Sequence, residues 1–122
     1  MTDFEIAQSQ AKIGGKPMML VFSGSDWCIW CVKLEREVLS RPEFAAWADA
    51  HAVIYTADFP EHSPQPEELK KQNAELAQQY GVDSFPTVVL TDAEGREIGR
   101  TGYRPGGAAA YIGHLGEILA KR

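Results

Sequence analysis

The chain has no long apolar stretch and no excess of positive charge. Its longest unbroken apolar run, Met18 to Phe22, falls far short of the roughly 20 residues that a membrane-spanning helix needs. The net charge of −5 gives no support for binding to nucleic acid or to an anionic membrane surface. No basic–apolar–small leader opens the sequence, so we expect a cytoplasmic protein, or a periplasmic or secreted one if a leader has been removed.

Cysteine is also scarce, and this limits what the two cysteines can do. Cys28 and Cys31 stand at Cys-x-x-Cys spacing, and a disulfide that closes so small a loop adds little stability. The pair is only half of a typical structural zinc site. His51, His62 and His114 share no ligand spacing with the cysteines or with one another, so no metal is predicted. The pattern therefore favours chemistry at the sulfur atoms.

Apolar runs and helical periodicities follow one another in the order helix, strand, helix, helix, strand, helix, strand, strand, helix. Strands are predicted at Met18–Phe22, Ala52–Phe59, Thr87–Thr91 and Arg96–Arg100. The first two should pair in parallel through a right-handed crossover, whereas the last two form an antiparallel hairpin. We therefore predict an α/β fold, with a mixed sheet of four or five strands, helices on both faces, and a single domain over residues 1–122.

The cysteine pair follows the first strand and opens a helix predicted from about Trp27 to Leu39. A thiol in the first turn of a helix faces unpaired backbone N–H groups and the positive end of the helix dipole. Both features favour the thiolate, which is the reactive form of cysteine. Cys31, one turn after Cys28, can reach the first sulfur, as reversible disulfide exchange requires. A reactive site is expected beyond the carboxyl end of a central strand, and Cys28 falls there.

Three segments resemble the active-site segments of thioredoxin-fold proteins, in the small thioredoxin-like family with a Trp-Cys-x-x-Cys site. These segments are Trp27-Cys28-Ile29-Trp30-Cys31, the run Tyr80-Gly81-Val82-Asp83-Ser84-Phe85-Pro86-Thr87, and Gly95 followed by Thr101-Gly102-Tyr103. The resemblance extends from Phe4 to Leu119. It implies the thioredoxin fold and the activity of a thiol–disulfide oxidoreductase.

The resemblance also implies how the cysteines would act. Cys28, exposed at the helix start, would attack a substrate disulfide, and the buried Cys31 would resolve the mixed disulfide. No dissociable cofactor is implied, because the dithiol itself carries the electrons. The expected partners are a disulfide-containing protein substrate and an external dithiol reductant, with the protein acting as a monomer. We favour the reductase direction over the oxidase direction.

The substrate-binding residues implied by the resemblance surround this pair. Pro86 matches the family's cis-proline beside the cysteines, and Phe85 would offer its backbone to an extended substrate segment. Trp27 and Gly102 would complete the docking rim, although Trp27 could equally be a packing residue. Trp30 is expected to be exposed beside the reactive centre and to add a contact surface. A ring folded back over the helix is the alternative for Trp30.

Two departures from the family pattern remove its buried acid relay. Thioredoxins keep a carboxylate six positions before the first cysteine, where this chain has Phe22, and the lysine that often accompanies it aligns with Ile54. Water, or a surface group such as Asp26 or Lys33, would then have to transfer protons for Cys31. A helix N-cap is the favoured alternative for Asp26, and a solvated side chain is the alternative for Lys33.

Two further functions stay open at this point. The fold could be a non-catalytic binding module that presents Trp27, Trp30 and Phe85 to a protein partner. It could also handle a metal through the dithiol, although the sequence offers no further soft ligands near the cysteines.

Overall fold

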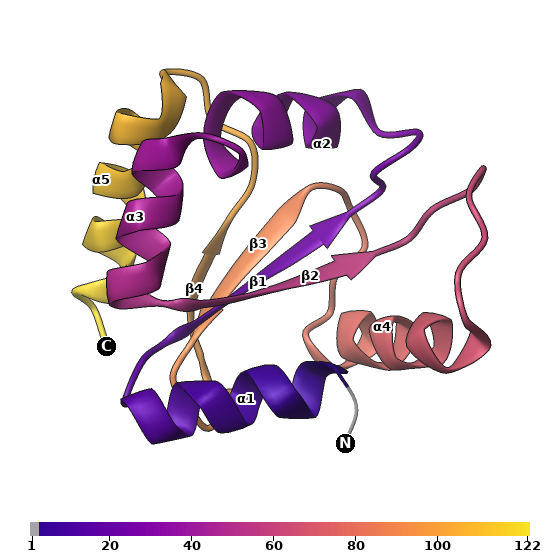
Figure 1. The fold of residues 1–122 in the computed structure, drawn as a ribbon, viewed down its shortest axis with the longest axis horizontal. Coiled ribbons are helices and arrows are strands. Elements are labelled where there is room, and N and C mark those ends of the chain that lie inside the picture. Colours follow the sequence, from indigo (N-terminus) through magenta and orange to yellow (C-terminus); the bar gives the residue numbers. More distant parts are fainter. Residues whose placement is uncertain (1–2) are drawn as a thin grey trace.

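The computed structural model describes residues 3–122 and consists of a four-stranded sheet with helices on both faces (Figure 1). The helices are α1 (Asp3–Gly14), α2 (Ile29–Leu34), the π-helix η1 (Glu35–Leu39), α3 (Pro42–His51), α4 (Glu67–Gln79) and α5 (Gly107–Leu119). The strands are β1 (Met18–Ser23), β2 (Val53–Asp58), β3 (Thr87–Thr91) and β4 (Glu97–Thr101). The predicted fold class is confirmed, with the lower of the two predicted strand numbers. Residues 1 and 2 of the predicted domain lie outside the described residues.

The strands lie in the order β2-β1-β3-β4. β1 runs parallel to β2 and antiparallel to β3, and β3 and β4 form the predicted antiparallel hairpin. The register places Ser23 opposite Asp58, and Phe22 opposite Thr87. The carboxyl ends of β1 and β2 and the start of β3 therefore meet at one edge of the sheet.

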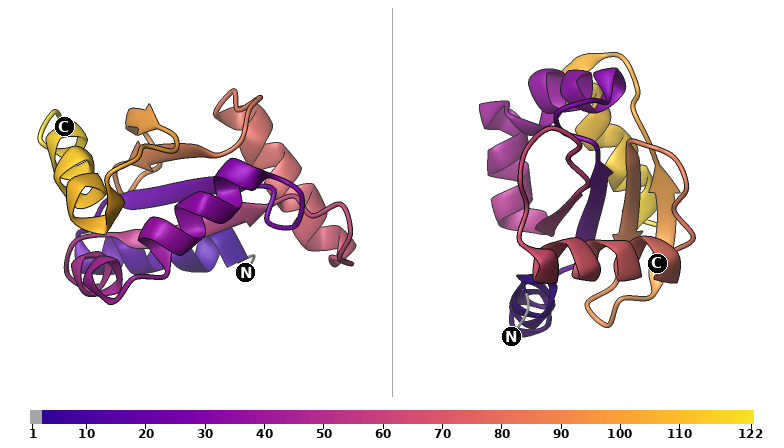
Figure 2. Two further views of the ribbon diagram at one scale, coloured as in Figure 1. Left: turned by 90° about the horizontal axis from the view of Figure 1, so that it is seen from above. Right: turned by 90° about the vertical axis from the view of Figure 1, so that its right-hand side faces the viewer.

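The central strand β1 explains why the sheet is covered on both faces. Its side chains alternate between two buried clusters, as the two-residue period of a strand requires. Met19 and Val21 pack with residues of α2, η1, α3 and α5, whereas Leu20 and Phe22 pack with residues of α1 and α4. Because both faces of β1 are buried, its sequence is an unbroken apolar run. Figure 2 shows the same arrangement from two further sides.

The helix that carries the cysteines begins later than predicted and changes its type before the predicted end at Leu39. It begins at Ile29, with Cys28 as its N-cap, and after Leu34 it continues as the π-helix η1. At the end of η1 the N–H of Ser40 donates to the carbonyl of Glu35, five residues back, at 2.9 Å. The apolar spacing predicts a continuous helix but does not reveal this widened turn.

Candidate active site

Cys28 and Cys31 lie where the loop after β1 enters α2. The N–H of Cys28 donates to the carbonyl of Gly24 at 2.9 Å, which closes the loop. Cys28 then caps α2 with extended backbone angles (φ −98°, ψ 109°), and its Sγ accepts the backbone N–H of Cys31 at 3.2 Å. Both cysteines are free thiols. One turn of helix therefore brings the first sulfur onto the backbone of the second cysteine, as the spacing predicts.

Cys28 is more enclosed than predicted, whereas Cys31 is buried as expected. Cys28 is 7% exposed and Cys31 is 3% exposed, so the expectation of an exposed Cys28 is wrong. The cap explains this, because a sulfur that accepts the Cys31 N–H is folded over the start of the helix. The neighbours Trp27, Ile29 and Trp30 are 41%, 67% and 50% exposed. A disulfide must therefore fit closely against these neighbours before it can reach Cys28.

The second thiol is held in its protonated form. Burial, followed by the hydrogen bond with Cys28, raises the pKa of Cys31 to about 11. Two contacts partly oppose this rise in the pKa: the N–H of Gly24 donates to Cys31 Sγ at 3.4 Å, and the Ser23 side chain also hydrogen-bonds the sulfur. Cys31 is therefore a thiol at neutral pH, and it must lose a proton before it can act as a nucleophile.

The peptide bond between Phe85 and Pro86 is cis, as the resemblance implied. Gly102, directly after β4, lies against it, because a Cβ added at Gly102 would be 3.1 Å from the Pro86 carbonyl oxygen. The hydroxyl of Tyr111 in α5 donates to the carbonyl of Gly102 at 2.7 Å. The structure thus brings two of the predicted rim residues, Pro86 and Gly102, into contact.

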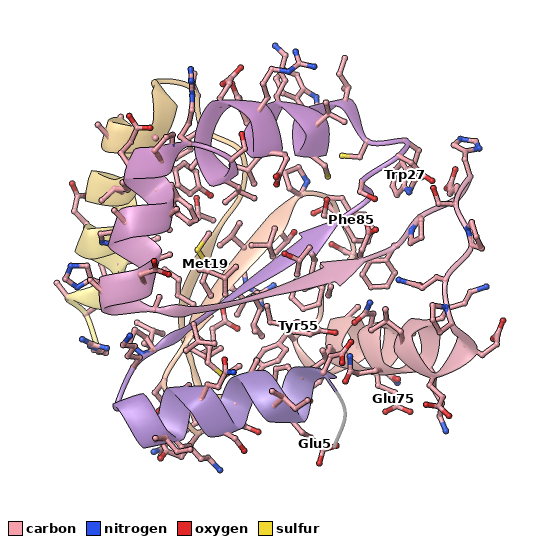
Figure 3. The ribbon with its side chains drawn as sticks, viewed as in Figure 1. Glu5, Met19, Trp27, Tyr55, Glu75 and Phe85 are labelled. Atoms are coloured by element: carbon pink, nitrogen blue, oxygen red, sulfur yellow. The ribbon has the colours of Figure 1, made fainter. Side chains whose placement is uncertain are left out.

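Trp27, Phe59 and Phe85 form an aromatic cluster at this edge of the sheet. The ring of Phe85 lies 5.7 Å from that of Trp27, edge to face, and 5.2 Å from that of Phe59. The indole N–H of Trp27 donates to the carbonyl of Phe59 at 2.7 Å. Figure 3 shows Trp27 and Phe85 at the same end of the molecule, beyond the tip of β1. Trp27 is both packed and exposed, so each of its two predicted roles has structural support.

Gly24 is what allows Trp27 to lie so close to the loop. A Cβ added at Gly24 would come within 2.3 Å of an indole carbon of Trp27, so no other residue fits there without displacing the ring. Neither Gly24 nor Phe59 was predicted as a site residue. The only sequence signal for Phe59 is its place at the end of the second predicted strand.

Trp30 lies in the first turn of α2 and makes two ring contacts. Its indole is 5.2 Å from the ring of Tyr103, and the ammonium of Lys33 lies 5.0 Å from its centroid. The hydroxyl of Tyr103 in turn donates to a carboxylate oxygen of Glu37. Trp30 therefore combines the predicted exposure with packing against neighbours, and Lys33 directs its charge at this ring.

Asp26 does not cap α2, so the N-cap prediction for it is wrong. Its two carboxylate oxygens accept the backbone N–H groups of Glu61 (2.9 Å) and His62 (2.8 Å). These hydrogen bonds, that of Glu61 first, hold the pKa of Asp26 below its usual value. The carboxylate anchors the proline-rich loop of residues 60–66, which follows β2, to the active-site loop of residues 24–28, which follows β1. Cys28 takes the cap instead, because it is the residue directly before the first helical turn.

The buried relay of thioredoxins is absent, as the sequence indicates. Phe22 is fully buried and packs in the core, and Ile54 packs against the opposite cluster. A pocket of about 350 Å³ lies beside Cys31 instead; most of its wall is apolar, but six of its eight lining residues carry polar groups, and it is named the polar pocket for these. Its lining residues are Ser23, Ser25, Cys31, Val32, Glu35, Arg36, Thr56 and Asp58. Asp58 was not predicted as a site residue.

Within residues 3–122, no cluster of three or more His, Cys, Asp or Glu side chains is arranged to hold a metal ion. In the same residues, no helix is both long and apolar enough to span a bilayer.

The chain is similar to known proteins in both sequence and structure. Residues 4–113 match the family model of the thioredoxin-like domain. The disulfide bond reductase DsbH of Chlamydia pneumoniae is 42% identical over 116 residues, which cover 95% of this chain and 70% of that protein. The thiol:disulfide interchange protein DsbD of Cronobacter sakazakii is 35% identical over 116 residues, but these cover 93% of this chain and only 18% of DsbD. A solved structure of a DsbH oxidoreductase superposes with a TM-score of 0.92 at 40% identity, over 99% of this chain and 84% of that one.

Proposed function

The chain belongs to the thioredoxin-like family and is a thiol–disulfide oxidoreductase, and from this we propose that it works as a reductase of protein disulfides. The observation that carries the proposal is the asymmetry of its two free thiols. Both thiols are buried, but Cys28 caps the start of the helix, whereas Cys31 lies within its first turn and its pKa is raised to about 11. The name of DsbH, a disulfide bond reductase, supports the reducing direction.

In the proposed reaction the Cys28 thiolate attacks one sulfur of a substrate disulfide. A mixed disulfide forms and the other substrate sulfur leaves as a thiolate. Cys31 then loses its proton and attacks Cys28 Sγ, which forms the Cys28–Cys31 disulfide and releases the second substrate thiol. The substrate gains two electrons and the protein loses two. An external dithiol reductant restores the protein, and no dissociable cofactor is needed because the dithiol carries the electrons.

The surface around Cys28 would hold the substrate during this reaction. Cys28 is nearly enclosed, so exchange requires that the approaching disulfide be aligned before attack. We assign this alignment to Trp27 and Phe85 of the aromatic cluster, to the Pro86–Gly102 contact, and to the exposed indole of Trp30. We further propose that the protein acts as a monomer, which light scattering would test.

Cysteine variants test the proposal directly. With insulin as the disulfide substrate and dithiothreitol as the reductant, Cys28→Ser should lose at least about a thousandfold in rate, because the attacking nucleophile is gone. After dithiothreitol has been removed, Cys31→Ser should still attack insulin but should remain trapped as a mixed disulfide, visible by mass spectrometry. No insulin reduction above background by the wild type, with unchanged binding of protein partners in Cys28→Ser, would favour the binding-module alternative.

The direction of electron flow needs a separate measurement, namely the potential of the Cys28–Cys31 pair against glutathione. A value near about −270 mV would identify a reductant, and a value near about −120 mV an oxidant.

A further inference from the structure

Resolution of the mixed disulfide poses a proton problem that the family's buried acid does not solve in this chain. The pKa of Cys31 is raised to about 11, chiefly by burial. The Cys28 thiol adds to this rise in the reduced protein and is gone in the mixed disulfide, but burial, the largest cause, still favours the Cys31 thiol there. The core position where thioredoxins keep a carboxylate is occupied by Phe22, which is fully buried. A different group must therefore accept the proton.

Ser23 and Asp58 place a hydroxyl and a carboxylate in the polar pocket beside Cys31. Ser23, at the end of β1, lines this pocket together with Cys31, and its side chain is one of the groups that lower the pKa of Cys31. In the parallel pairing of β1 with β2, Ser23 is the register partner of Asp58, and both residues line the pocket together with Cys31. The pocket is large enough to admit several water molecules. The pocket therefore holds a hydroxyl and a carboxylate beside the sulfur, with room for water between them.

Asp58 is also fixed in place. Its Oδ1 accepts the backbone N–H of Ser25 at 3.0 Å, and its Oδ2 accepts the Ser25 hydroxyl at 2.7 Å. Both bonds come from the active-site loop, so the carboxylate keeps its orientation towards the pocket.

The other charged or titratable groups around the Cys31 thiol are weaker candidates. Glu35 and Arg36 line the same pocket from η1, but both are exposed, whereas Asp58 is half-buried. Cys28 is consumed in the mixed disulfide at this stage of the reaction. Asp26 binds the backbone of Glu61 and His62 and is not among the residues that line the pocket.

We propose that Asp58 accepts, through Ser23 and solvent in the polar pocket, the proton that Cys31 loses when it attacks the mixed disulfide. This inference rests on the proposed function. As the Cys31 S–H bond breaks, its electron pair forms the bond to Cys28 Sγ, and the bond between Cys28 and the substrate sulfur breaks. The substrate thiolate takes a proton from solvent, and Asp58 returns its proton to solvent. Asp58 does not touch the sulfur, so it acts as a positioning residue and Ser23 is the group in contact.

The two steps can be separated with a chromogenic aryl disulfide in stopped-flow experiments. Attack by Cys28 releases one coloured thiolate, and resolution by Cys31 releases the second. In Asp58→Asn the first phase should be unchanged and the second about tenfold slower below about pH 8. The difference should shrink as the pH rises, because hydroxide then removes the Cys31 proton without help from a carboxylate. Asparagine keeps an oxygen for the Ser25 N–H, so the loop should be preserved.

Matched variants show whether the effect belongs to Asp58. Ser23→Ala should slow the second phase in the same pH-dependent way, and it serves as the test if Asp58→Asn does not fold. Asp26→Asn and Glu35→Gln each remove a nearby carboxylate and should leave both phases within about twofold of the wild type.

Three results would overturn the inference. If Asp58 acts only as a fixed negative charge, its removal lowers the pKa of Cys31 and the second phase becomes faster. A slowing that is equal at every pH would mean a merely structural role. A slow second phase in Glu35→Gln, with Asp58→Asn normal, would assign the proton to Glu35. Failure of the wild-type protein to release even the first thiolate would instead overturn the proposed function, and the inference with it.

Discussion

The two sides of the cysteine pair are built from opposite kinds of side chain. On the side of Trp27, the aromatic cluster is apolar and partly exposed, and its rings contact one another at 5.2–5.7 Å. On the side of Cys31, the polar pocket is lined by hydroxyls, carboxylates and a guanidinium. Apolar aromatic surface suits contact with a polypeptide, whereas hydroxyls and carboxylates suit the movement of protons. In the proposed mechanism, substrate contact and proton transfer would therefore take place on different sides of the cysteine pair.

Gly24 is the residue that joins these two sides. Its carbonyl accepts the N–H of Cys28, its own N–H donates to Cys31 Sγ, and the indole of Trp27 lies against its α-carbon. A substitution at Gly24 can therefore disturb the aromatic cluster and the surroundings of Cys31 at the same time. Substitutions in the aromatic cluster and in the polar pocket should therefore differ in their effects.

Gly24→Ala should disturb the aromatic side most strongly. The added methyl would come within 2.3 Å of the Trp27 indole, so the ring must leave its place against the loop. We expect a loss of about 2 kcal/mol in the free energy of unfolding, in the range for overpacked sites. Chemical denaturation measures this loss, and the intrinsic fluorescence of Trp27 should shift in the native state.

Gly113→Ala in α5 is the matched control. Nothing lies within 4 Å of a Cβ added at this helical position, so alanine should raise the free energy of unfolding by about 0.5–1 kcal/mol. If Gly24→Ala were as stable as the wild type, the close packing of Trp27 on the loop would not hold in solution.

The raised pKa of Cys31 should make the free energy of unfolding depend on pH. Burial raises the pKa of Cys31 from 9.0 to about 11, so the folded protein holds this proton more tightly than the unfolded chain does. The resulting stabilisation is complete below pH 9 and is lost as the pH rises towards 11. We expect the reduced protein to lose about 1–2 kcal/mol of unfolding free energy across this window.

Cys31→Ser provides the comparison for this measurement, because serine does not ionise in the same range. Urea unfolding of both reduced proteins at several pH values separates Cys31 from the tyrosines, which are common to both chains. Parallel pH profiles for the wild type and Cys31→Ser would contradict the raised pKa.

The fold and the cysteine site could be predicted because their signals are local. The unbroken run from Met18 to Phe22 indicates a strand buried on both faces, and the Cys28–Cys31 spacing places both thiols in one helical turn. The cis bond before Pro86 followed from a motif shared with a known family. In each case the residues that define the feature lie within a few positions of one another, or in a recognised motif.

The features that the sequence did not reveal depend on contacts between distant segments. Asp58 enters the pocket only because the parallel register pairs it with Ser23. Asp26 binds backbone groups 35 and 36 residues away instead of capping the helix that follows it. The enclosure of Cys28 has a different origin. It arises locally, from the direction of its side chain at the cap, which spacing alone does not determine.

The smallest expected effect concerns Trp27 and Trp30, the two tryptophans beside the cysteines. Each directly precedes a cysteine in the sequence, but their contacts in the structure differ. Trp27→Phe keeps a ring for Phe85 but loses the indole hydrogen bond to the Phe59 carbonyl, and it should cost about 1 kcal/mol of unfolding free energy. Trp30→Phe keeps an aromatic face for Tyr103 and Lys33 and should change this free energy by less than about 0.5 kcal/mol. Denaturation midpoints and the KM for insulin should be measured for both variants. Equal stability, with KM raised only for Trp27→Phe, would mean that Trp27 serves substrate contact alone, and the aromatic cluster would then be a docking surface without a structural role.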